Sequence, residues 1–286
     1  MAFLVFMTTR SIGFIDHQLD NYHANVFLDL LRGDLKARGW VVARCWGMDA
    51  KGGKKWAAEK GVSYVENVSG MRDCDALMIL APSNPEVHFP MAKLALPLGL
   101  PTYIDKTFTQ DHPTAKKIFA LADRRRVPVI TASALRCCAS LDKAVKELGK
   151  KRIRHMRTWG PGRSFEEYAI HPMEMVISVM GPEVRKVMWL KHGNDHQIQM
   201  EFSGGRTATV FLHIGSQCAY QAMLTNNEKT IHVNCSADPI FRDLCDFILD
   251  FFEAGKETID RRESLAIRKI LDVASDKRAQ GKFIRV

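Results

Sequence analysis

Apolar and polar positions change their rhythm about halfway along the chain. In the first half, short apolar runs alternate with segments of helical periodicity, and one run, Asp75 to Ala81, is almost continuously apolar. Such a run is typical of a strand buried on both faces of a parallel sheet. Because parallel neighbours need helical crossovers, this half is expected to form a doubly wound parallel sheet. The pattern predicts strands over residues 11–16, 40–46, 62–65, 75–81, 102–104 and 127–132, with helices over 24–31, 49–60, 86–96 and 114–124.

The second half alternates less regularly and carries turn signals at Gly193-Asn194 and Gly204-Gly205. Strands joined by such short turns favour a mainly antiparallel open sheet. The expected architecture is a Rossmann-type α/β domain over residues 1–137, followed by an α+β domain over residues 138–286. The second domain is predicted to have strands over 152–159, 184–192, 196–202, 206–213 and 229–234, and helices over 141–150, 241–252 and 262–274.

A further buried helix, beginning near Pro172, is predicted in the second half. Proline is tolerated at the first helical position, and the Gly-Pro pair after residue 180 is a typical helix stop. Glu167 and His171 are then expected in the turn before the helix, where a carboxylate and an imidazole form a plausible acid/base pair. Alternatively, Ser164 and Glu167 form a capping box of an earlier helix, and His171 is a half-buried residue bonded to backbone.

The composition, with 46% hydrophobic and 26% charged residues, is typical of soluble globular proteins. The apolar run over residues 2–7 is too short to span a bilayer and has no basic stretch before it. This argues against a signal peptide or a membrane partner and predicts a cytoplasmic location. The seven cysteines are odd in number and lack a C-x-x-C pair, so reduced thiols are expected.

The formal net charge of +9 suits an anionic partner, either a nucleic acid or a phosphate-bearing small molecule. The basic clusters at residues 51–55, 124–126 and 150–152 are short, separated and without interleaved aromatic residues. We interpret them as solvated faces, so no nucleic-acid partner is expected. His192 and His196 are separated by a turn and have no third ligand nearby, so no metal site is predicted.

Several short motifs lie where the predicted parallel strands end, which is the edge where such sheets bind ligands. One buried strand ends in the proline-containing loop Ala81 to His88, and the next ends in Asp105-Lys106-Thr107. The second half then carries Glu-x-x-x-His from Glu167 to His171, ahead of a helix. With these motifs in this order, and with its C-terminal pattern of two helices and a Gly-Lys pair, the chain from about residue 11 resembles the glucose-fructose oxidoreductase, inositol dehydrogenase and MocA (Gfo/Idh/MocA) family.

The resemblance implies an NAD- or NADP-dependent oxidoreductase acting on a hydroxyl of a sugar, sugar acid or cyclitol. It implies that Lys106 approaches nicotinamide and substrate, that His171 is the general base or acid, and that Glu167 orients it or binds a hydroxyl. Removing a hydroxyl proton while hydride leaves the carbon needs a base with a pKa near working pH, and a nearby lysine favours the developing negative charge. The implied cofactor-binding residues are Gly13, Asp16, His17, His23, Asp49, Ala81, Pro82, Ser83, Asn84, His88, Asp105 and Lys106, and the candidates for the substrate pocket are Arg136, Trp159 and Tyr168.

The largest departure from the family pattern is in the first loop. A dinucleotide fingerprint requires G-x-G-x-x-G, because glycines let the backbone close on a pyrophosphate. Here Gly13 alone survives, while Asp16 and Asp20 add negative charge. Either the cofactor is held in another way, for instance by His17 or His23 and backbone N–H groups, or it binds poorly or not at all.

Three smaller departures concern the cofactor and the reaction centre. The acid that usually grips the ribose is absent at Gly47, and the lysines between residues 51 and 55 either favour the 2′-phosphate of NADP or form a solvated face. Thr107 stands where the family has proline, which leaves Lys106 less rigidly held. Glu167 stands where the family has aspartate, so its carboxylate is one methylene further out.

Two other functions remain open. Loss of the glycine loop suits a cofactor-poor ligand sensor or regulatory subunit, and relatives of the family include NAD-dependent lyases and glycosidases that reduce and reoxidise NAD within each turnover. A homodimer through the C-terminal sheet is expected if helices leave its apolar face uncovered. That predicted face carries Met188, Leu190, Met200, Phe202, Val210 and Leu212.

Overall fold

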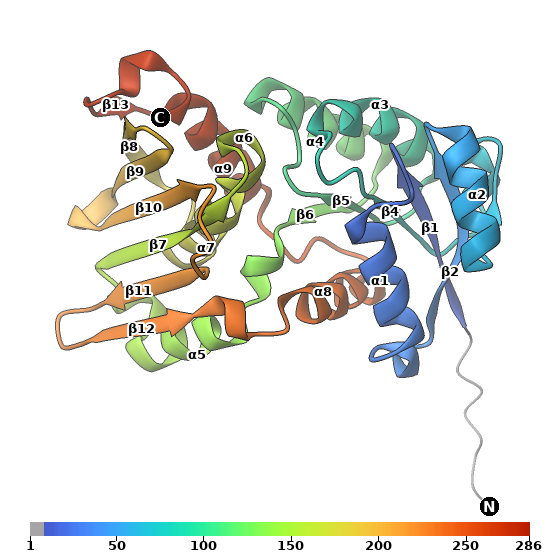
Figure 1. Ribbon diagram of the computed structural model, residues 1–286, viewed down its shortest axis with the longest axis horizontal. Coiled ribbons are helices and arrows are strands. Elements are labelled where there is room, and N and C mark those ends of the chain that lie inside the picture. The colour runs from blue at the N-terminus through green and yellow to red at the C-terminus, as the bar shows by residue number, and fades with distance from the viewer. Residues whose placement is uncertain (1–8) are drawn as a thin grey trace, which may run out of the picture. The chain divides into compact units, whose positions relative to one another are not determined.

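The computed structural model describes residues 9–286, so the apolar run over residues 2–7 lies outside the described part (Figure 1). The chain forms two compact units. The first contains the described residues up to Phe108, together with Lys117–Thr131 and Cys245–Thr258. The second contains Thr109–Lys116, Ala132–Leu244 and Ile259–Val286, so the grouping differs from a single division after residue 137.

The first unit is built on a six-stranded sheet of order β3-β2-β1-β4-β5-β6. β1 pairs in parallel with β2 and β4, and β4 pairs in parallel with β5. β4 is buried along its whole length, as its apolar sequence predicts. The predicted doubly wound parallel sheet is confirmed. Its strands are β1 (Arg10–Asp16), β2 (Trp40–Gly47), β3 (Ser63–Tyr64), β4 (Ala76–Ile79), β5 (Thr102–Asp105) and β6 (Val129–Ala132).

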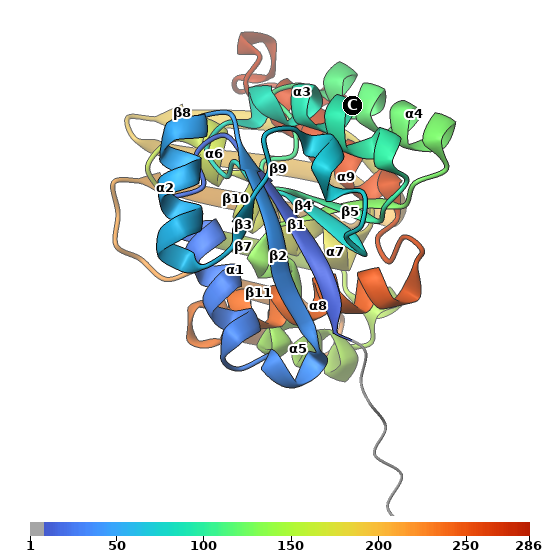
Figure 2. The same ribbon diagram turned by 90° about the vertical axis from the view of Figure 1, so that its right-hand side faces the viewer.

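Helices cover both faces of this sheet. In Figure 2, α1 and α8 lie on one side of the strands, and α3 and α4 lie on the other. The apolar residues of α1 recur at helical spacing and face inward, which is why this segment forms a helix against β2. The helices are α1 (Tyr22–Arg32), α2 (Ala50–Lys60), α3 (Pro85–Ala95), α4 (His112–Arg125) and α8 (Ile240–Ala254).

The second unit contains a seven-stranded sheet of order β12-β11-β7-β10-β9-β8-β13. Its β7–β10 pair is parallel and its other pairs are antiparallel, so the prediction of a mainly antiparallel sheet is confirmed. The pattern did not predict β11. The strands are β7 (His155–Gly162), β8 (Val184–His192), β9 (Asp195–Phe202), β10 (Thr207–Ile214), β11 (Gln221–Thr225), β12 (Thr230–Asn234) and β13 (Ile284–Arg285), and the helices are α5 (Ala139–Leu148), α6 (Phe165–Tyr168), α7 (Ile170–Met180) and α9 (Arg261–Ala274).

The central helix of the second unit is α7, which packs against β7, β10 and α9. It begins at Ile170, so the predicted start at Pro172 is wrong by two residues, and His171 lies in the first turn of the helix. The reason is the short helix α6 just before it. Ser164 caps α6 by accepting a hydrogen bond from the Glu167 N–H at 3.3 Å, which starts the helical path early.

Helices cover the inner face of the second sheet, with α7 on β7 and β10, α9 on β8 and α5 on β11 and β12. Four residues of the predicted apolar face lie there, each at most 3% exposed: Met200, Phe202, Val210 and Leu212. Met188 and Leu190 lie on the outer face, so the prediction is wrong for these two. The buried partner of Met200 on the next strand is Val187, which puts its neighbour Met188 on the other side.

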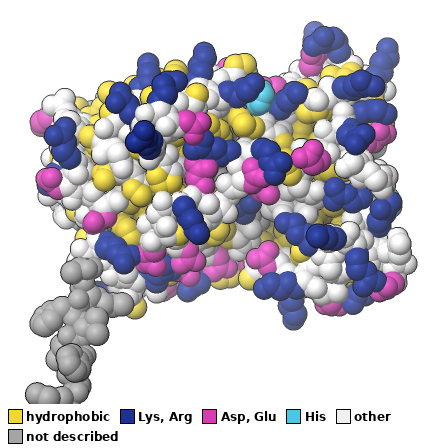
Figure 3. All heavy atoms as spheres, turned by 180° about the vertical axis from the view of Figure 1, so that it is seen from behind, with side chains coloured by type: hydrophobic (Ala, Val, Ile, Leu, Met, Phe, Trp, Pro, Cys, Tyr) yellow, Lys and Arg dark blue, Asp and Glu magenta, His cyan; other side chains and the backbone are white. Residues whose placement is uncertain are grey.

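Lys and Arg side chains are spread over the face in Figure 3, among acidic, apolar and other residues, without gathering in one stripe. Within residues 9–286, no helix combines the length and the apolar character that crossing a membrane requires. In the same part of the chain, no three His, Cys, Asp or Glu side chains come together as a metal site.

Candidate active site

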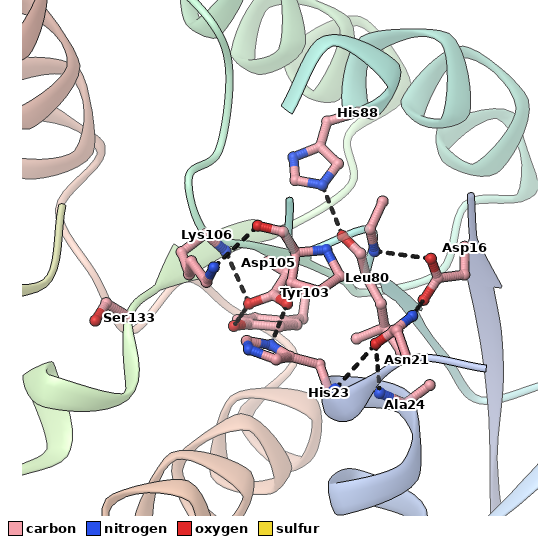
Figure 4. Close-up of polar contacts among 12 residues, drawn as sticks. Asp16, Asn21, His23, Ala24, Leu80, His88, Tyr103, Asp105, Lys106 and Ser133 are labelled. Atoms are coloured by element: carbon pink, nitrogen blue, oxygen red, sulfur yellow. Dashed lines mark hydrogen bonds and ion pairs between the residues drawn. The ribbon is translucent and has the colours of Figure 1, made fainter. Parts of the chain in front are cut away.

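The carboxyl ends of β1, β4 and β5 bring polar residues together in the first unit (Figure 4). Asp16 is the last residue of β1, Pro82 follows β4, Asp105 ends β5, and Lys106 comes directly after it. Asp16 is 1%, Asp105 0% and Lys106 7% exposed. Burying charge is costly unless other polar groups compensate it, so the hydrogen bonds of this cluster determine its properties.

Asp16 links the end of β1 to the loop after β4. Its carboxylate accepts hydrogen bonds from the Ala81 and Gln18 N–H groups, both at 3.1 Å, and from Asn21 Nδ2 at 2.7 Å. Burial raises the pKa of Asp16 to about 6, although these bonds act in the opposite direction. The turn after β1 therefore holds a negative charge at neutral pH.

Asn21 caps the first turn of α1. Its Oδ1 accepts hydrogen bonds from the N–H groups of His23 at 2.9 Å and Ala24 at 3.1 Å. Its Nδ2 donates to Asp16 and to Gln18 O at 2.6 Å. N–H groups at the start of a helix have no partner within the helix and commonly bind anions. Here two of them are already engaged by the chain itself.

His23 reaches from α1 to Asp105, with Nδ1 at 2.5 Å from the carboxylate (Figure 4). Asp105 also accepts hydrogen bonds from the Tyr103 hydroxyl at 3.0 Å and from the Lys106 backbone N–H at 2.8 Å. Burial opposes ionisation of Asp105, but the His23 imidazole and the Lys106 ammonium hold its pKa below the ordinary value. Asp105 is thus a buried, ionised acid that balances nearby positive charge.

The loop after β4 orients Lys106, whose Nζ donates a hydrogen bond to Pro82 O at 2.9 Å. The peptide bond from Lys106 to Thr107 is cis. Thr107 is 2% exposed, and its Oγ1 has no hydrogen-bond partner in the described part of the chain. Most buried hydroxyl groups in proteins have a partner, so this oxygen has bonding capacity left for a further group.

Two residues predicted to bind cofactor have structural roles instead. Gly13 lies inside β1, where an added Cβ would come within 2.7 Å of Met71 Sδ, so this glycine permits close packing. His88 is fully buried, and its ring nitrogens lie 2.7 Å from Phe108 O and 2.6 Å from Leu80 O. It joins two loops through their backbone and presents no nitrogen to a ligand.

The other residues predicted to bind cofactor have different surroundings. Asp49 is the N-cap of α2, and its Oδ1 accepts a hydrogen bond from the Gly52 N–H at 3.1 Å. Ser83 is exposed, and Asn84 donates to a carboxylate in the first turn of α3 at 2.9 Å. The Nδ1 atom of His17 is buried and has no hydrogen-bond partner among residues 9–286. His17 and Thr107 thus both carry buried polar atoms available for further bonds.

A cavity of about 280 Å³ opens between the turn after β1 and the start of α2. Three acids and one lysine stand in its wall, which makes it a poor site for a phosphate and a better one for hydroxyl groups. The lysines next to it are also partly engaged, because Lys54 pairs with Glu66 at 2.7 Å. The lining residues are Gln18, Leu19, Asp20, Asp49, Gly52, Lys55, Trp56 and Glu59.

In the second unit, His171 is held in the first turn of α7 by a 2.7 Å hydrogen bond between its Nδ1 and Ser133 Oγ. Its half-buried ring contacts Tyr168 and Tyr220 edge-on, at centroid distances of 5.7 Å and 5.6 Å. Thr158 fixes the start of the helix through a 2.9 Å hydrogen bond to its backbone.

Two glycines of β7 make room for these tyrosines. A Cβ added at Gly160 would lie 2.1 Å from the Tyr220 ring, and one added at Gly162 would lie 2.8 Å from Tyr168 Cβ. The Tyr220 hydroxyl also donates to Pro161 O on the same strand at 3.0 Å. The strand therefore sets the positions of both rings next to His171.

Arg136, predicted to contact substrate, is the centre of a buried group of ion pairs. It bonds Glu174 of α7 at 2.5 Å and Glu263 of α9 at 2.6 Å. Burial raises the pKa of Glu174, while Arg136 and the Ser133 backbone N–H act against that shift. The guanidinium is committed to two carboxylates, so its role is to fix the segment after β6 onto α7 and α9.

The remaining predicted residues separate into two groups. Tyr168 is next to His171, whereas Trp159 lies on the outer face of β7 and stacks on His232 at 5.6 Å. Because α7 packs on the inner face, Trp159 lies on the opposite side of the sheet from His171. Glu167 lies on α6, where its N–H bonds the Ser164 cap, which is one of the two hydrogen bonds of the capping box in the alternative interpretation.

Three residues of these clusters had no assigned role from the sequence. Asn21 stands directly before a helix, which is a recognisable N-cap signal. Ser133 follows β6 at the edge where ligands are expected, but its residue type gives no hint of a histidine partner. Tyr220 directly precedes β11, the strand that the pattern did not predict, so nothing placed it near His171.

No protein-family model matches the chain, and no curated protein matches its sequence. Solved structures do share its fold. GenD2 from gentamicin A biosynthesis, in complex with NAD, is 12% identical with a TM-score of 0.81, over 98% of this chain and 97% of that one. Myo-inositol 2-dehydrogenase from Lactobacillus plantarum is 16% identical with a TM-score of 0.80, over 98% and 100% of the two chains. Scyllo-inositol dehydrogenase from Lactobacillus casei is 13% identical with a TM-score of 0.81, over 98% and 99%. The fold implied by the Gfo/Idh/MocA resemblance is confirmed along nearly the whole chain.

Proposed function

We propose that this chain is an NAD(P)-dependent oxidoreductase that oxidises a hydroxyl of a sugar, sugar acid or cyclitol. The proposal starts from the fold, which the chain shares with two inositol dehydrogenases and with GenD2 solved with NAD. The observation that carries it is Lys106, a nearly buried ammonium at the carboxyl edge of the parallel sheet, held by Pro82 O and balanced by Asp105. A fixed positive charge at this edge suits an oxygen that becomes negative during oxidation.

Proton transfer is assigned to His171. Ser133 bonds Nδ1 of this ring and fixes its orientation, and the proposal gives the exchange of the hydroxyl proton to Nε2. Lys106 is assigned to favour negative charge that develops on a substrate oxygen, because a nearby ammonium makes a hydroxyl proton easier to remove. Tyr168 and Tyr220 limit the rotation of the imidazole and offer flat surfaces to a sugar ring.

The residues present fit the two nucleoside ends of a dinucleotide better than its pyrophosphate. The cavity beside α2 offers carboxylates to ribose hydroxyls, and Thr107 Oγ1 is a buried hydroxyl with bonding capacity left. The turn between Asp16 and Asn21 contains no glycine, and its charge is negative. A bound nicotinamide supplies the hydride acceptor for the reaction.

NAD is the better candidate of the two dinucleotides. The cavity wall carries Asp20, Asp49 and Glu59 against Lys55, so an added 2′-phosphate meets more negative than positive charge. Lys54, next to the cavity, is paired with Glu66. Titration of the protein with NAD and NADP tests this preference, and tighter binding of NADP would reverse it.

The catalytic assignment is tested by NADH formation on a panel of polyols, sugars and sugar acids. Lys106→Met and His171→Asn are each expected to lower kcat/KM by at least about 100-fold. Lys93→Met on α3 and His213→Asn on β10 are matched controls that keep wild-type turnover. Unchanged turnover in both test variants would remove the assigned roles.

A second candidate is a non-catalytic ligand sensor on the same scaffold. The closed turn at Asp16 and Asn21 favours it, because a lost phosphate site lowers affinity for a dinucleotide. Lack of NAD and NADP binding at millimolar concentration supports the sensor, and a cofactor that copurifies with the protein excludes it. A lyase or glycosidase is distinguished by product formation without net NADH.

A symmetric homodimer through the outer face of the second sheet completes the proposal. That face carries partly exposed Trp159, Met188, Leu190, Phe211 and Met223, a set suited to a second copy of the same surface. Sedimentation that finds monomer alone at micromolar concentration would exclude the dimer.

All seven cysteines are free thiols, which suits a reducing compartment such as the cytoplasm.

A further inference from the structure

We infer that the turn between β1 and α1 is closed by the chain's own side chains and does not take the diphosphate of a dinucleotide, which is instead held by its nucleoside ends. The inference rests on the proposed function, because it specifies how that cofactor is recognised. It differs from the usual arrangement, in which the first helix of such a sheet points free N–H groups at the phosphates.

The first argument concerns hydrogen-bond donors. The N–H groups of His23 and Ala24 donate to Asn21 Oδ1, and the Gln18 N–H donates to Asp16 Oδ1 at 3.1 Å. A phosphate oxygen that approached α1 would have to replace these side-chain oxygens. Replacing one acceptor by another yields little net free energy, so a diphosphate gains little from these donors.

The second argument concerns charge. The Asp16 carboxylate is 1% exposed and is bonded to Asn21 Nδ2, so it stays in the turn and cannot rotate freely toward solvent. Asp20, four residues further on, adds a second carboxylate that bonds Asn25 at 3.1 Å. A diphosphate brought to this turn meets charge of its own sign in a partly buried place, where repulsion is weakly screened.

The third argument concerns space. Leu19, in the middle of the turn, is 1% exposed and packs against the backbone of Gly47 and Gly53. A Cβ at Gly47 or Gly53 would lie 3.6 Å or 3.4 Å from Leu19 Cδ1, an ordinary van der Waals distance, so the leucine side chain lies directly against both positions. The turn is therefore anchored by an apolar side chain at the place where a glycine-rich loop leaves room for phosphate.

The cavity of about 280 Å³ next to this turn is the site that we assign to the nucleoside. Gln18, Asp20 and Asp49 offer amide and carboxylate groups to hydroxyls, while Trp56 adds an aromatic surface. A neutral nucleoside satisfies these groups without bringing negative charge to Asp16.

Isothermal titration calorimetry of the full chain with adenosine, ADP and NAD tests the inference. ADP and adenosine are expected to bind with affinities within about threefold of each other, with little change between low and physiological salt. ADP binding more than about tenfold tighter than adenosine would overturn the inference. Amide NMR signals give a direct second readout: those of His23 and Ala24 are expected to stay in place when ADP is added, and their movement on ADP but not on adenosine would also overturn it.

Asp16→Asn removes the buried charge with little change in shape. It is expected to raise the affinity for ADP relative to adenosine by about tenfold, whereas Asp20→Asn, the exposed neighbour in the same turn, changes this ratio by less than about threefold. Equal effects of the two variants would overturn the assignment to Asp16. If adenosine, ADP and NAD all fail to bind, the proposed function and the nucleoside site fall, while a turn that takes no diphosphate is supported.

Discussion

Ser133 Oγ lies 2.7 Å from Nδ1 of His171 and so connects the segment after β6 to the first turn of α7. The Ser133 backbone N–H also bonds Glu174, one helical turn after His171. Ser133 is thus held by one residue of α7 while it holds another. We assign it the role of a positioning residue that keeps the imidazole in one tautomer and one orientation.

Replacing this hydroxyl tests that role. Ser133→Ala is expected to lower kcat by about 10- to 100-fold with a small change in KM, because the imidazole loses its fixed orientation. The pH profile of kcat is expected to shift as well, and 15N chemical shifts of the His171 ring report a change of tautomer even without turnover. Ser178→Ala on the same helix is the control, since its hydroxyl bonds Met175 O. An unchanged tautomer and pH profile in Ser133→Ala would reduce Ser133 to a packing residue.

The ion-pair group around Arg136 makes a prediction about stability. Arg136→Met leaves the buried Glu174 and Glu263 without their shared cation, so the free energy of unfolding is expected to fall by about 3–5 kcal/mol. Arg262→Ala breaks an exposed pair with Asp260 and is expected to leave the free energy of unfolding nearly unchanged. Urea denaturation of both variants measures the difference. Similar losses in the two would show that the buried group is no stronger than a surface pair.

Asp16 makes a prediction about pH. Its pKa is raised by burial to about 6, so the folded state binds this proton more tightly than the unfolded state does. Between about pH 4 and 7 the contribution of Asp16 to stability therefore falls as pH rises, by about 3 kcal/mol in total. Asp16→Asn removes this dependence. The free energy of unfolding of the variant minus that of the wild type is therefore expected to be more positive at pH 7 than at pH 5. Parallel pH profiles for the two proteins would contradict the prediction.

The close approach of Tyr220 to β7 makes a prediction about packing. Gly160→Ala places a methyl group 2.1 Å from the Tyr220 ring, so the ring must move away from its position beside His171. We expect a loss of about 1–3 kcal/mol in stability together with lower activity. In a Tyr220→Ala background the same Gly160→Ala change is expected to cost much less. A cost that is equal in both backgrounds would show that the glycine matters for another reason.

Strand periodicity predicted the first unit well because a strand buried on both faces is apolar at every position, as in β4. The carboxyl ends of those strands then located Asp105 and Lys106 without knowledge of any side-chain contact. In β8 the odd and the even positions are both apolar, with Val187 and Trp189 on one face and Met188 and Leu190 on the other. The sequence therefore could not tell which of the two faces helices cover. β11 buries Ala222 and Leu224, but the apolar Met223 between them breaks the alternation, so five residues gave a weak strand signal.

Side-chain direction explains the other differences. Arg136 and Trp159 belong to segments that neighbour α7, which carries His171. The Arg136 side chain bonds two carboxylates, and the Trp159 side chain points to the outer face of β7. Residue type and spacing contain neither fact. The sequence showed that the first loop lacks the glycines of a dinucleotide fingerprint. It did not show that Asn21 caps α1 there, because that depends on the backbone geometry of the folded chain.

The clip formed by His88 has a mechanical consequence. The buried imidazole of His88 lies between the carbonyls of Leu80 and Phe108 and, as a neutral ring, donates a hydrogen bond to one of them. These carbonyls flank the segments that carry Pro82 and Lys106. The packed ring restrains the two segments relative to each other. A molecule that binds there therefore loses little free energy to ordering them, because they are already ordered in the folded chain. Damage to this hidden ring would weaken ligand capture from a position that no ligand touches.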